Sequence, residues 1–232
     1  PLIHDALHLN EAQLGLLFSA FYPSYVLCMP ATGWLAERFG AKRVLAAGIA
    51  IWSLATLLTG FAWSFTSLLA LRLMLGVGES VAFPCASKVL ANTVEVARLG
   101  VANGILSFGY LLGPAVGTFL GGMLMARYGW RPVFIVFGAA SLLWLWPWLR
   151  ARIDAPSGAG GGGAAGAAKP KPRPPPLALI LRQRALWGAS VGHFAANYTY
   201  YFILSWLPLY LVKARGFSIG SMAMIASWAY LL

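Results

Sequence analysis

Apolar residues are grouped into long stretches separated by short polar connections. The stretches cover residues 14–35, 44–61, 68–90, 101–125, 133–149 and 186–212, and a last one begins at 219 and continues to Leu232. Each complete stretch has close to the ~20 residues that a helix needs to cross a bilayer. The pattern predicts an all-α membrane protein with seven spans. We expect the chain to be part of a longer protein, because Pro1 is not an initiator and Leu232 lies inside an apolar stretch.

The composition agrees with a membrane protein. Hydrophobic residues make up 59% of the 232 residues, charged residues 10%, and the mean hydropathy is +0.72. A soluble domain has about a quarter charged residues, so a soluble globular domain and a disordered chain are both excluded. The two cysteines, Cys28 and Cys85, are too few for a disulfide framework or a zinc cluster, and we expect no metal or cofactor.

One segment breaks the pattern of spans. Residues 151–176 are rich in Gly and Ala and then in Pro, a composition typical of a flexible and then stiffer linker. We therefore divide the chain into a membrane unit (1–150), a linker (151–185) and the beginning of a second membrane unit (186–232).

The net charge of +11 follows the connections between spans. Lys and Arg concentrate in the linker and in the connections after the first and third stretches. The opposite side has only Arg127, Arg131, Lys213 and Arg215. Cytoplasmic loops carry such an excess, so the linker is predicted to be cytoplasmic and the bilayer to be the partner, with no role for nucleic acid.

The connection after the first stretch reads GWLAERFGAKR. This pattern resembles the signature loop of the major facilitator superfamily, which joins the second and third spans; most members have Asp where this chain has Glu37. The resemblance implies a conformational-switch loop, whose residues here are Gly33, Glu37, Arg38, Gly40, Lys42 and Arg43. The simpler alternative is that the cations only set the topology.

The resemblance also implies an organisation. Members have two six-helix halves joined by a cytoplasmic loop, each half built from inverted three-helix repeats. On this pattern 1–150 is an N-terminal half without its first span, 151–185 is the cytoplasmic linker, and 186–232 contains span seven and the start of span eight.

The interior of the stretch 68–90 contains two charged residues, Arg72 and Glu79, and Lys88 lies near its end. A charge at mid-membrane costs at least ~2.5–3.5 kcal/mol, so such residues are functional candidates. Seven residues are nearly two helical turns, which places both on one face about 10 Å apart, too far for a direct bond but close enough to share a cavity. A structural charge pair with another helix is the alternative.

The arrangement Arg72-x6-Glu79 followed by Phe83-Pro84 resembles the anion:cation symporters of this superfamily, which include sugar-acid and hexuronate permeases. The resemblance implies that Glu79, assisted by Arg72, couples transport to protons. Tyr25 matches a tyrosine of the second span that lines the sugar-acid pocket. The stretch 186–212 is also similar to the seventh span of the family. Asn197 and Tyr201 are four residues apart and share a helix face, so we expect both to bind substrate together with Arg72, the permanent charge that suits an anion. An aromatic belt or plain helix packing is the alternative for this span.

Two features keep other functions open. Sugar-acid members often have Gln in the fifth span, near which this chain has Gly109 and Tyr110. The glycines around Gly113-Pro114 resemble the superfamily's antiporter motif. We expect proton-coupled symport of a small organic anion, a sugar acid, by a monomer in a bacterial inner membrane. The alternative is an antiporter that exports organic anions or drug-like compounds. An enzyme is not expected, since no nucleophile–base pair is visible.

Overall fold

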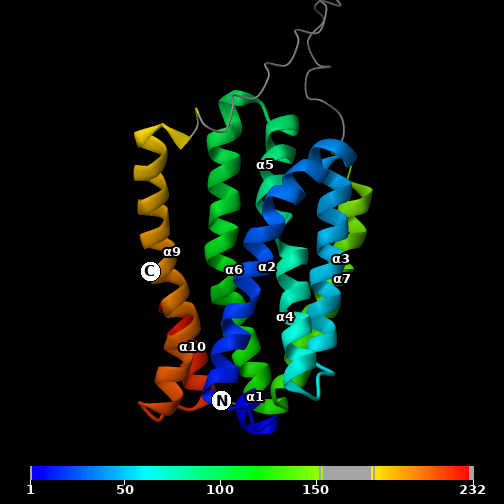
Figure 1. The fold of residues 1–232 in the computed structure, drawn as a ribbon. Coiled ribbons are helices and arrows are strands. Elements are labelled where there is room, and N and C mark those ends of the chain that lie inside the picture. The colour runs from blue at the N-terminus through cyan, green and yellow to red at the C-terminus, as the bar shows by residue number, and fades with distance from the viewer. Residues whose placement is uncertain (1, 152, 154–178, 180, 230–232) are drawn as a thin grey trace, which may run out of the picture.

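The structure is a computed structural model that describes residues 2–151, 153, 179 and 181–229, and these form a helical bundle without strands (Figure 1). The all-α prediction is confirmed. The first five helices are α1 (Leu2–Ala6), α2 (Glu11–Phe39), α3 (Ala41–Thr59), α4 (Phe65–Glu79) and α5 (Ala82–Thr93). A 3-10 turn, η1 (Val96–Arg98), leads into α6 (Leu99–Tyr128), α7 (Trp130–Arg150), α9 (Arg184–Lys213) and α10 (Ile219–Ala229).

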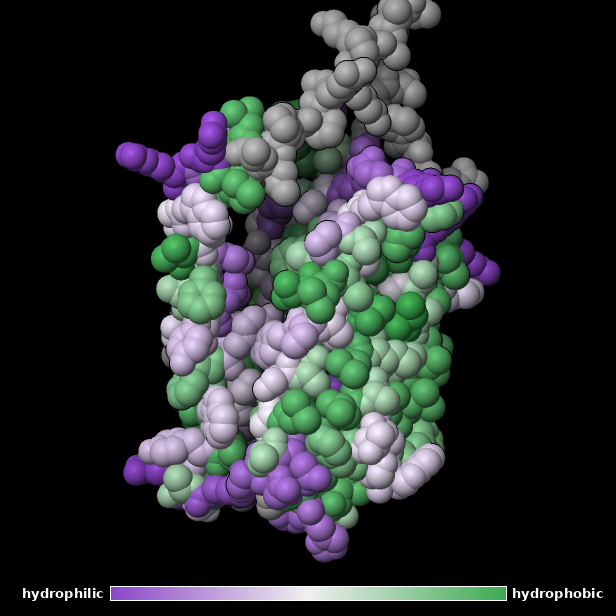
Figure 2. Space-filling model, in the orientation of Figure 1, coloured by the Kyte–Doolittle hydropathy of each residue, from purple (hydrophilic) through white to green (hydrophobic). Residues whose placement is uncertain are grey.

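The helices cover the predicted spans. Five segments are long and apolar enough to cross a membrane: Glu11–Phe39, Ala41–Thr59, Phe65–Thr93, Val96–Tyr128 and Trp130–Arg150. Helix α9 has 30 residues, but its Tyr, Trp, His and Asn side chains lower its hydropathy, so it is not among the five. Space-filling spheres show apolar residues along the sides of the bundle and hydrophilic residues at its two ends (Figure 2).

The predicted span 68–90 is broken into two helices. Pro84 has no N–H for the carbonyl of Ser80, four residues earlier, and its ring disfavours a continuous helix. Helix α4 ends at Glu79 and α5 begins at Ala82. The Thr32 hydroxyl of α2 donates a hydrogen bond to the Ser80 carbonyl at 3.1 Å. A side chain of α2 thus occupies the acceptor that the proline leaves free, and the break lies directly after Glu79.

Helices α2, α3, α4 and α7 pack closely together. Helix α3 lies against α7 and α4, and α2 lies against α4. Glycines allow these approaches. A Cβ at Gly76 would overlap the Ser24 hydroxyl and the Phe21 carbonyl of α2. A Cβ at Gly78 would lie 2.7 Å from the backbone nitrogen of Trp52 in α3. The glycines fix α4, and with it Arg72 and Glu79, between α2 and α3.

Helices α9 and α10 form a second group. Helix α10 packs on the lower part of α6, where Ala115 of α6 joins Leu211, Met222 and Ala226 in a buried cluster (Figure 1). Helix α9 packs on α10 but separates from α6 and α2 toward its N-terminus. The division of the chain into two halves remains a prediction, and most of the predicted linker 151–185 lies outside the described residues.

The bundle has two unlike ends. One end, called here the cationic end, carries Arg38, Lys42, Arg43, Lys88, Arg98, Arg150, Arg182 and Arg184. The other, called the α1 end, carries α1 with Arg127, Arg131, Lys213 and Arg215. The helices alternate in direction, so the connections with most Lys and Arg meet at one end.

Candidate functional site

Arg72 and Glu79 line one cavity of about 520 Å³ between α2, α4 and α9, which we call the charged cavity. Both side chains are half-buried, and their charges interact with one another. Within the described residues no ion pair of 4.0 Å or less joins them. The remaining wall is formed by Leu14, Phe18, Phe21, Tyr22, Leu75, Tyr201, Leu204, Ser205, Pro208 and Leu209. A fixed cation and a carboxyl group therefore face the same mostly apolar space.

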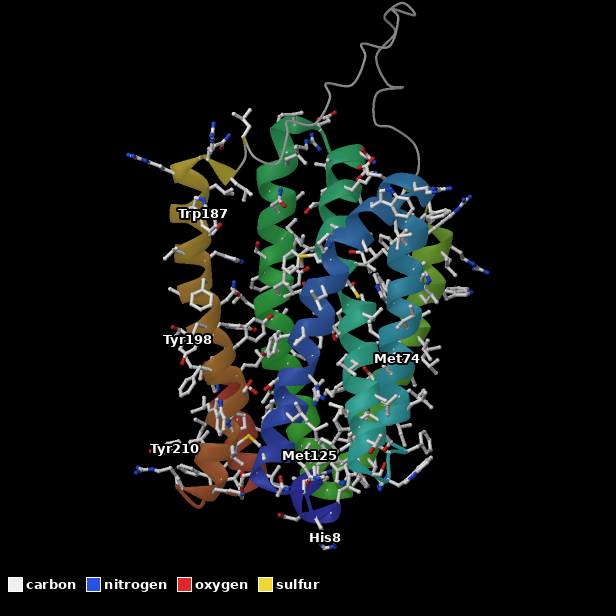
Figure 3. The ribbon with its side chains drawn as sticks, in the orientation of Figure 1. His8, Met74, Met125, Trp187, Tyr198 and Tyr210 are labelled. Carbon is white, nitrogen blue, oxygen red and sulfur yellow. The ribbon has the colours of Figure 1, made fainter. Side chains whose placement is uncertain are left out.

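A second cavity, of about 660 Å³, lies beside the first and contains Asn197 on its wall, and we call it the amide cavity. The Asn197 side-chain nitrogen donates to the His193 carbonyl at 3.1 Å, one turn earlier in α9. That bond leaves the amide oxygen of Asn197 as an acceptor for other groups. Tyr198 of α9, labelled in Figure 3, lines the same cavity, and Figure 2 shows the surface hollowed between α9 and the rest of the bundle.

The two predicted tyrosines take different places. Tyr201 lines both cavities. Tyr25 lines neither of them: its ring stacks on Phe21, with centroids 5.4 Å apart. It nevertheless lies within electrostatic range of Glu79 and Tyr201. The structure thus brings Arg72, Glu79 and Tyr201 to one cavity, Asn197 to its neighbour, and Tyr25 to the layer behind the charged cavity.

The signature loop forms a tight corner between α2 and α3. Gly40 has φ +89°, a backbone conformation that favours glycine, and it is the single residue between the two helices. Glu37 forms an ion pair with Lys88 of α5 at 2.7 Å, and Lys88 also donates to the Ala36 carbonyl at 3.0 Å. The corner is therefore tied to α5.

The other loop residues face different partners. The Arg38 guanidinium lies over the Trp34 ring at 5.3 Å, and the Lys42 carbonyl accepts from the Trp148 indole at 3.2 Å. A Cβ at Gly33 would meet no atom within 4 Å, so the described contacts give this glycine no packing role. Arg43 follows Lys42 in the first turn of α3 at the cationic end.

Sequence reasoning missed three residues. The sequence showed Lys88 only as one of the cations that set the membrane topology, although Lys88 forms an ion pair with Glu37. Tyr22 of α2 and Ser205 of α9 line both cavities, and their hydroxyl groups interact with each other. A tyrosine three residues before Tyr25 lies nearly on the same helix face, which is the one sequence signal for Tyr22. Nothing in the sequence distinguishes Ser205.

Comparison with known proteins identifies the family. The family model described as Major Facilitator Superfamily matches residues 1–232. The chain belongs to the major facilitator superfamily. This match confirms the resemblance given by the signature loop. Together with the five apolar helices, it identifies the chain as part of a multi-pass membrane protein, in a family of transporters rather than enzymes.

The relatives with curated names include transporters of organic anions. The chain is 36% identical to a probable sulfoacetate transporter of Cupriavidus necator, over 98% of the chain and 55% of that protein. It is 30% identical to a hexuronate transporter of Bacillus subtilis, over 100% of the chain and 55% of that protein. The chain thus spans about half the length of these relatives.

A solved structure agrees on the fold. A bacterial homologue of the human lysosomal transporter Spinster, in an inward-facing and unoccupied conformation, superposes with a TM-score of 0.79 at 24% identity. The match covers 99% of this chain and 54% of that one. At this identity the likeness concerns the fold alone.

Proposed function

We propose that this protein is a secondary active transporter that carries a small organic anion, a sugar acid, together with protons across a bacterial inner membrane, and that it acts as a monomer. The observation that carries the proposal is the charged cavity, in which Arg72 and Glu79 face one space between α2, α4 and α9. The named relatives are a probable sulfoacetate transporter and a hexuronate transporter, and both names refer to small organic acids, which supports the substrate class.

Charge balance in the cavity explains the coupling. Arg72 stays protonated at any physiological pH, and a lone cation inside the membrane is costly. Ionised Glu79 supplies one counter-charge when the cavity is empty. When an anionic substrate arrives, a proton on Glu79 leaves the substrate as the counter-charge of Arg72. Both the empty state and the state with proton plus anion avoid an unbalanced charge, so the two solutes travel together.

The size and lining of the cavity fit such a substrate. A volume of about 520 Å³ lies within the range of small-molecule sites, ~300–1,000 Å³. The hydroxyl of Tyr201 and, in the amide cavity, the Asn197 amide offer partners for substrate hydroxyls, which would otherwise lose hydrogen bonds on leaving water. We therefore assign substrate binding to Arg72, Asn197 and Tyr201, with Tyr25 supporting from behind, and proton coupling to Glu79.

Replacement of Glu79 tests the proposal. Uptake of D-glucuronate and of sulfoacetate into proteoliposomes is measured with an inward proton gradient, and anion exchange is measured without one. Because Glu79→Gln cannot bind and release a proton, gradient-driven uptake falls to the background level while exchange continues. The matched control is Glu95→Gln, which changes an exposed carboxyl that pairs with Arg98 at 3.7 Å. Unchanged gradient-driven uptake by Glu79→Gln would overturn the coupling role.

A ligand panel separates the symporter from the antiporter. A ligand that binds only the folded state raises the melting temperature. We expect sugar acids or sulfoacetate to stabilise the protein and Arg72→Gln to abolish the effect. Stabilisation by lipophilic cations and by no anion would overturn the symporter proposal and favour the antiporter.

A further inference from the structure

Four residues line both the charged cavity and the amide cavity and form the partition between them: Phe18 and Tyr22 of α2, and Tyr201 and Ser205 of α9. Tyr22 of α2 and Ser205 of α9 line both cavities, and their hydroxyl groups interact with each other. The Tyr22 ring also meets the Tyr201 ring edge-on, with centroids 5.3 Å apart and an interplanar angle of 80°. The partition is thus built jointly by the helix groups α2–α7 and α9–α10.

The position of Tyr22 relates it to the fixed cation. Arg72 lines the same cavity, and its charge interacts with the Tyr22 hydroxyl group. An acid group that binds Arg72 therefore arrives beside the hydroxyls of Tyr22 and Ser205. Neither hydroxyl is needed to fill space, because Phe and Ala would occupy nearly the same volume.

Pairing of the two hydroxyls lowers the free-energy cost of burying them in the empty site. A hydroxyl away from water loses free energy unless it is hydrogen-bonded, and in a pair of hydroxyls one donates and the other accepts. Hydrogen bonds to an ionised acceptor are about twice as strong as bonds between neutral groups. An anion beside Arg72 therefore offers both hydroxyls a better partner than they offer each other.

We propose that Tyr22 and Ser205 are two further anion-binding residues, which pair with each other in the empty cavity and donate to the substrate's acid group when Arg72 binds it. The proposal rests on the proposed anion site. It adds that the bound anion takes hydrogen bonds from α2 and α9 together and so replaces the direct link between them. Anion binding is thereby tied to the contact between the two helix groups.

The test is a double-mutant cycle with the variants Tyr22→Phe, Ser205→Ala and the pair. Tyr22→Phe keeps the ring that meets Tyr201 and removes only the hydroxyl. Binding of D-glucuronate and of sulfoacetate is measured by calorimetry, and uptake gives KM and kcat. We expect each single variant to weaken anion binding about tenfold, and KM to rise with little change in kcat. Tyr210→Phe is the control, since Tyr210 lies on α9 outside both cavities.

The empty protein gives an independent readout. Each single variant leaves one hydroxyl without its partner, whereas the double variant removes both. We expect the melting temperature of the ligand-free protein to fall in each single variant and to recover in the double variant, whose anion binding remains weakened. A residue with a merely structural role would not separate the two measurements in this way.

The outcomes distinguish this inference from the proposed function. If the unmodified protein binds neither anion, the proposed function fails. If it binds them and Tyr22→Phe binds them equally well, the proposed function stands and the inference is overturned. Loss of recovery in the double variant would also overturn it, because the two hydroxyls would then not be partners.

Discussion

The α1 end and the cationic end differ in how α9 and α10 meet the rest of the bundle. At the α1 end, α10 crosses α6 so closely that a Cβ at Gly122 would overlap the Cβ of Ala223. Lys213 at the end of α9 also forms an ion pair with Glu11 at 3.4 Å. At the cationic end, Trp187 and Val191 of α9 are exposed, and Figure 3 shows Trp187 near the top of the separated helix.

The difference shows that small residues in one helix do not by themselves bring a second helix close. Helix α6 has glycines along its whole length, and a Cβ at Gly104 or Gly117 would meet no atom within 4 Å. Gly122 is different because Ala223 of α10 faces it, and Ala226 of α10 joins Ala115 of α6 in a buried cluster. The two helix groups are therefore held at one end and apart at the other, which is the geometry for pivoting about the closed end.

The largest expected effect concerns which end faces the cytoplasm. In a variant without Cys28 and Cys85, a cysteine at Ala165, outside the described residues, reacts with an impermeant maleimide only after the cells are opened. A cysteine at Ser218, between α9 and α10 at the α1 end, reacts in intact cells. The physical reason is the excess of Lys and Arg at the cationic end. Labelling of Ala165→Cys in intact cells would overturn the assignment of the cationic end to the cytoplasm.

The next effect concerns the closed end itself. Gly122→Leu places a side chain where Ala223 lies, and overpacking costs about 1–3 kcal/mol. We expect the α1 end to open in a correspondingly larger fraction of molecules, roughly 5- to 150-fold. The labelling rate of Ser218→Cys measures this opening, and Gly117→Leu is the matched control with open space around it. Equal labelling rates in the two variants would refute the contact.

The smallest effect is assigned to the ion pair between Lys213 and Glu11. Both side chains are exposed, and exposed pairs contribute about 0.2–1 kcal/mol. Glu11→Gln therefore raises the same labelling rate by no more than about fivefold. The unmodified protein in 1 M salt should behave like the variant, because salt screens surface charges. An effect as large as that of Gly122→Leu would mean that the ion pair, not helix packing, closes this end.

The sequence was most informative about the helices. Apolar stretches must pair their backbone groups internally inside a bilayer, so each stretch has to form a helix wherever its neighbours lie. The predicted and observed bounds differ by two to four residues at most ends. The exception is the break after Glu79. Pro84 signals it, but the Thr32 hydroxyl that caps the freed carbonyl comes from another helix.

Only part of the candidate site could be predicted from the sequence. Arg72 and Glu79 could be identified singly, because an ionisable residue in an apolar stretch is conspicuous without knowledge of its neighbours. Their common cavity followed from helical periodicity along α4. Tyr22 and Ser205 are ordinary residues in their own helices, and their importance arises from a contact between positions 183 residues apart. Periodicity within one helix carries no information about such a pair.

The amino-acid sequence by itself determined the helical membrane architecture, the uneven charge of the two ends, the signature loop and the two ionisable residues of α4. These depend on hydropathy, charge and spacing along one segment. Only the tertiary structure decided that Glu37 pairs with Lys88, that Tyr25 lies behind the cavity, and that α9 and α10 meet the bundle at one end. Those features depend on how far helices approach each other, and that distance is set by the side chains of both partners together.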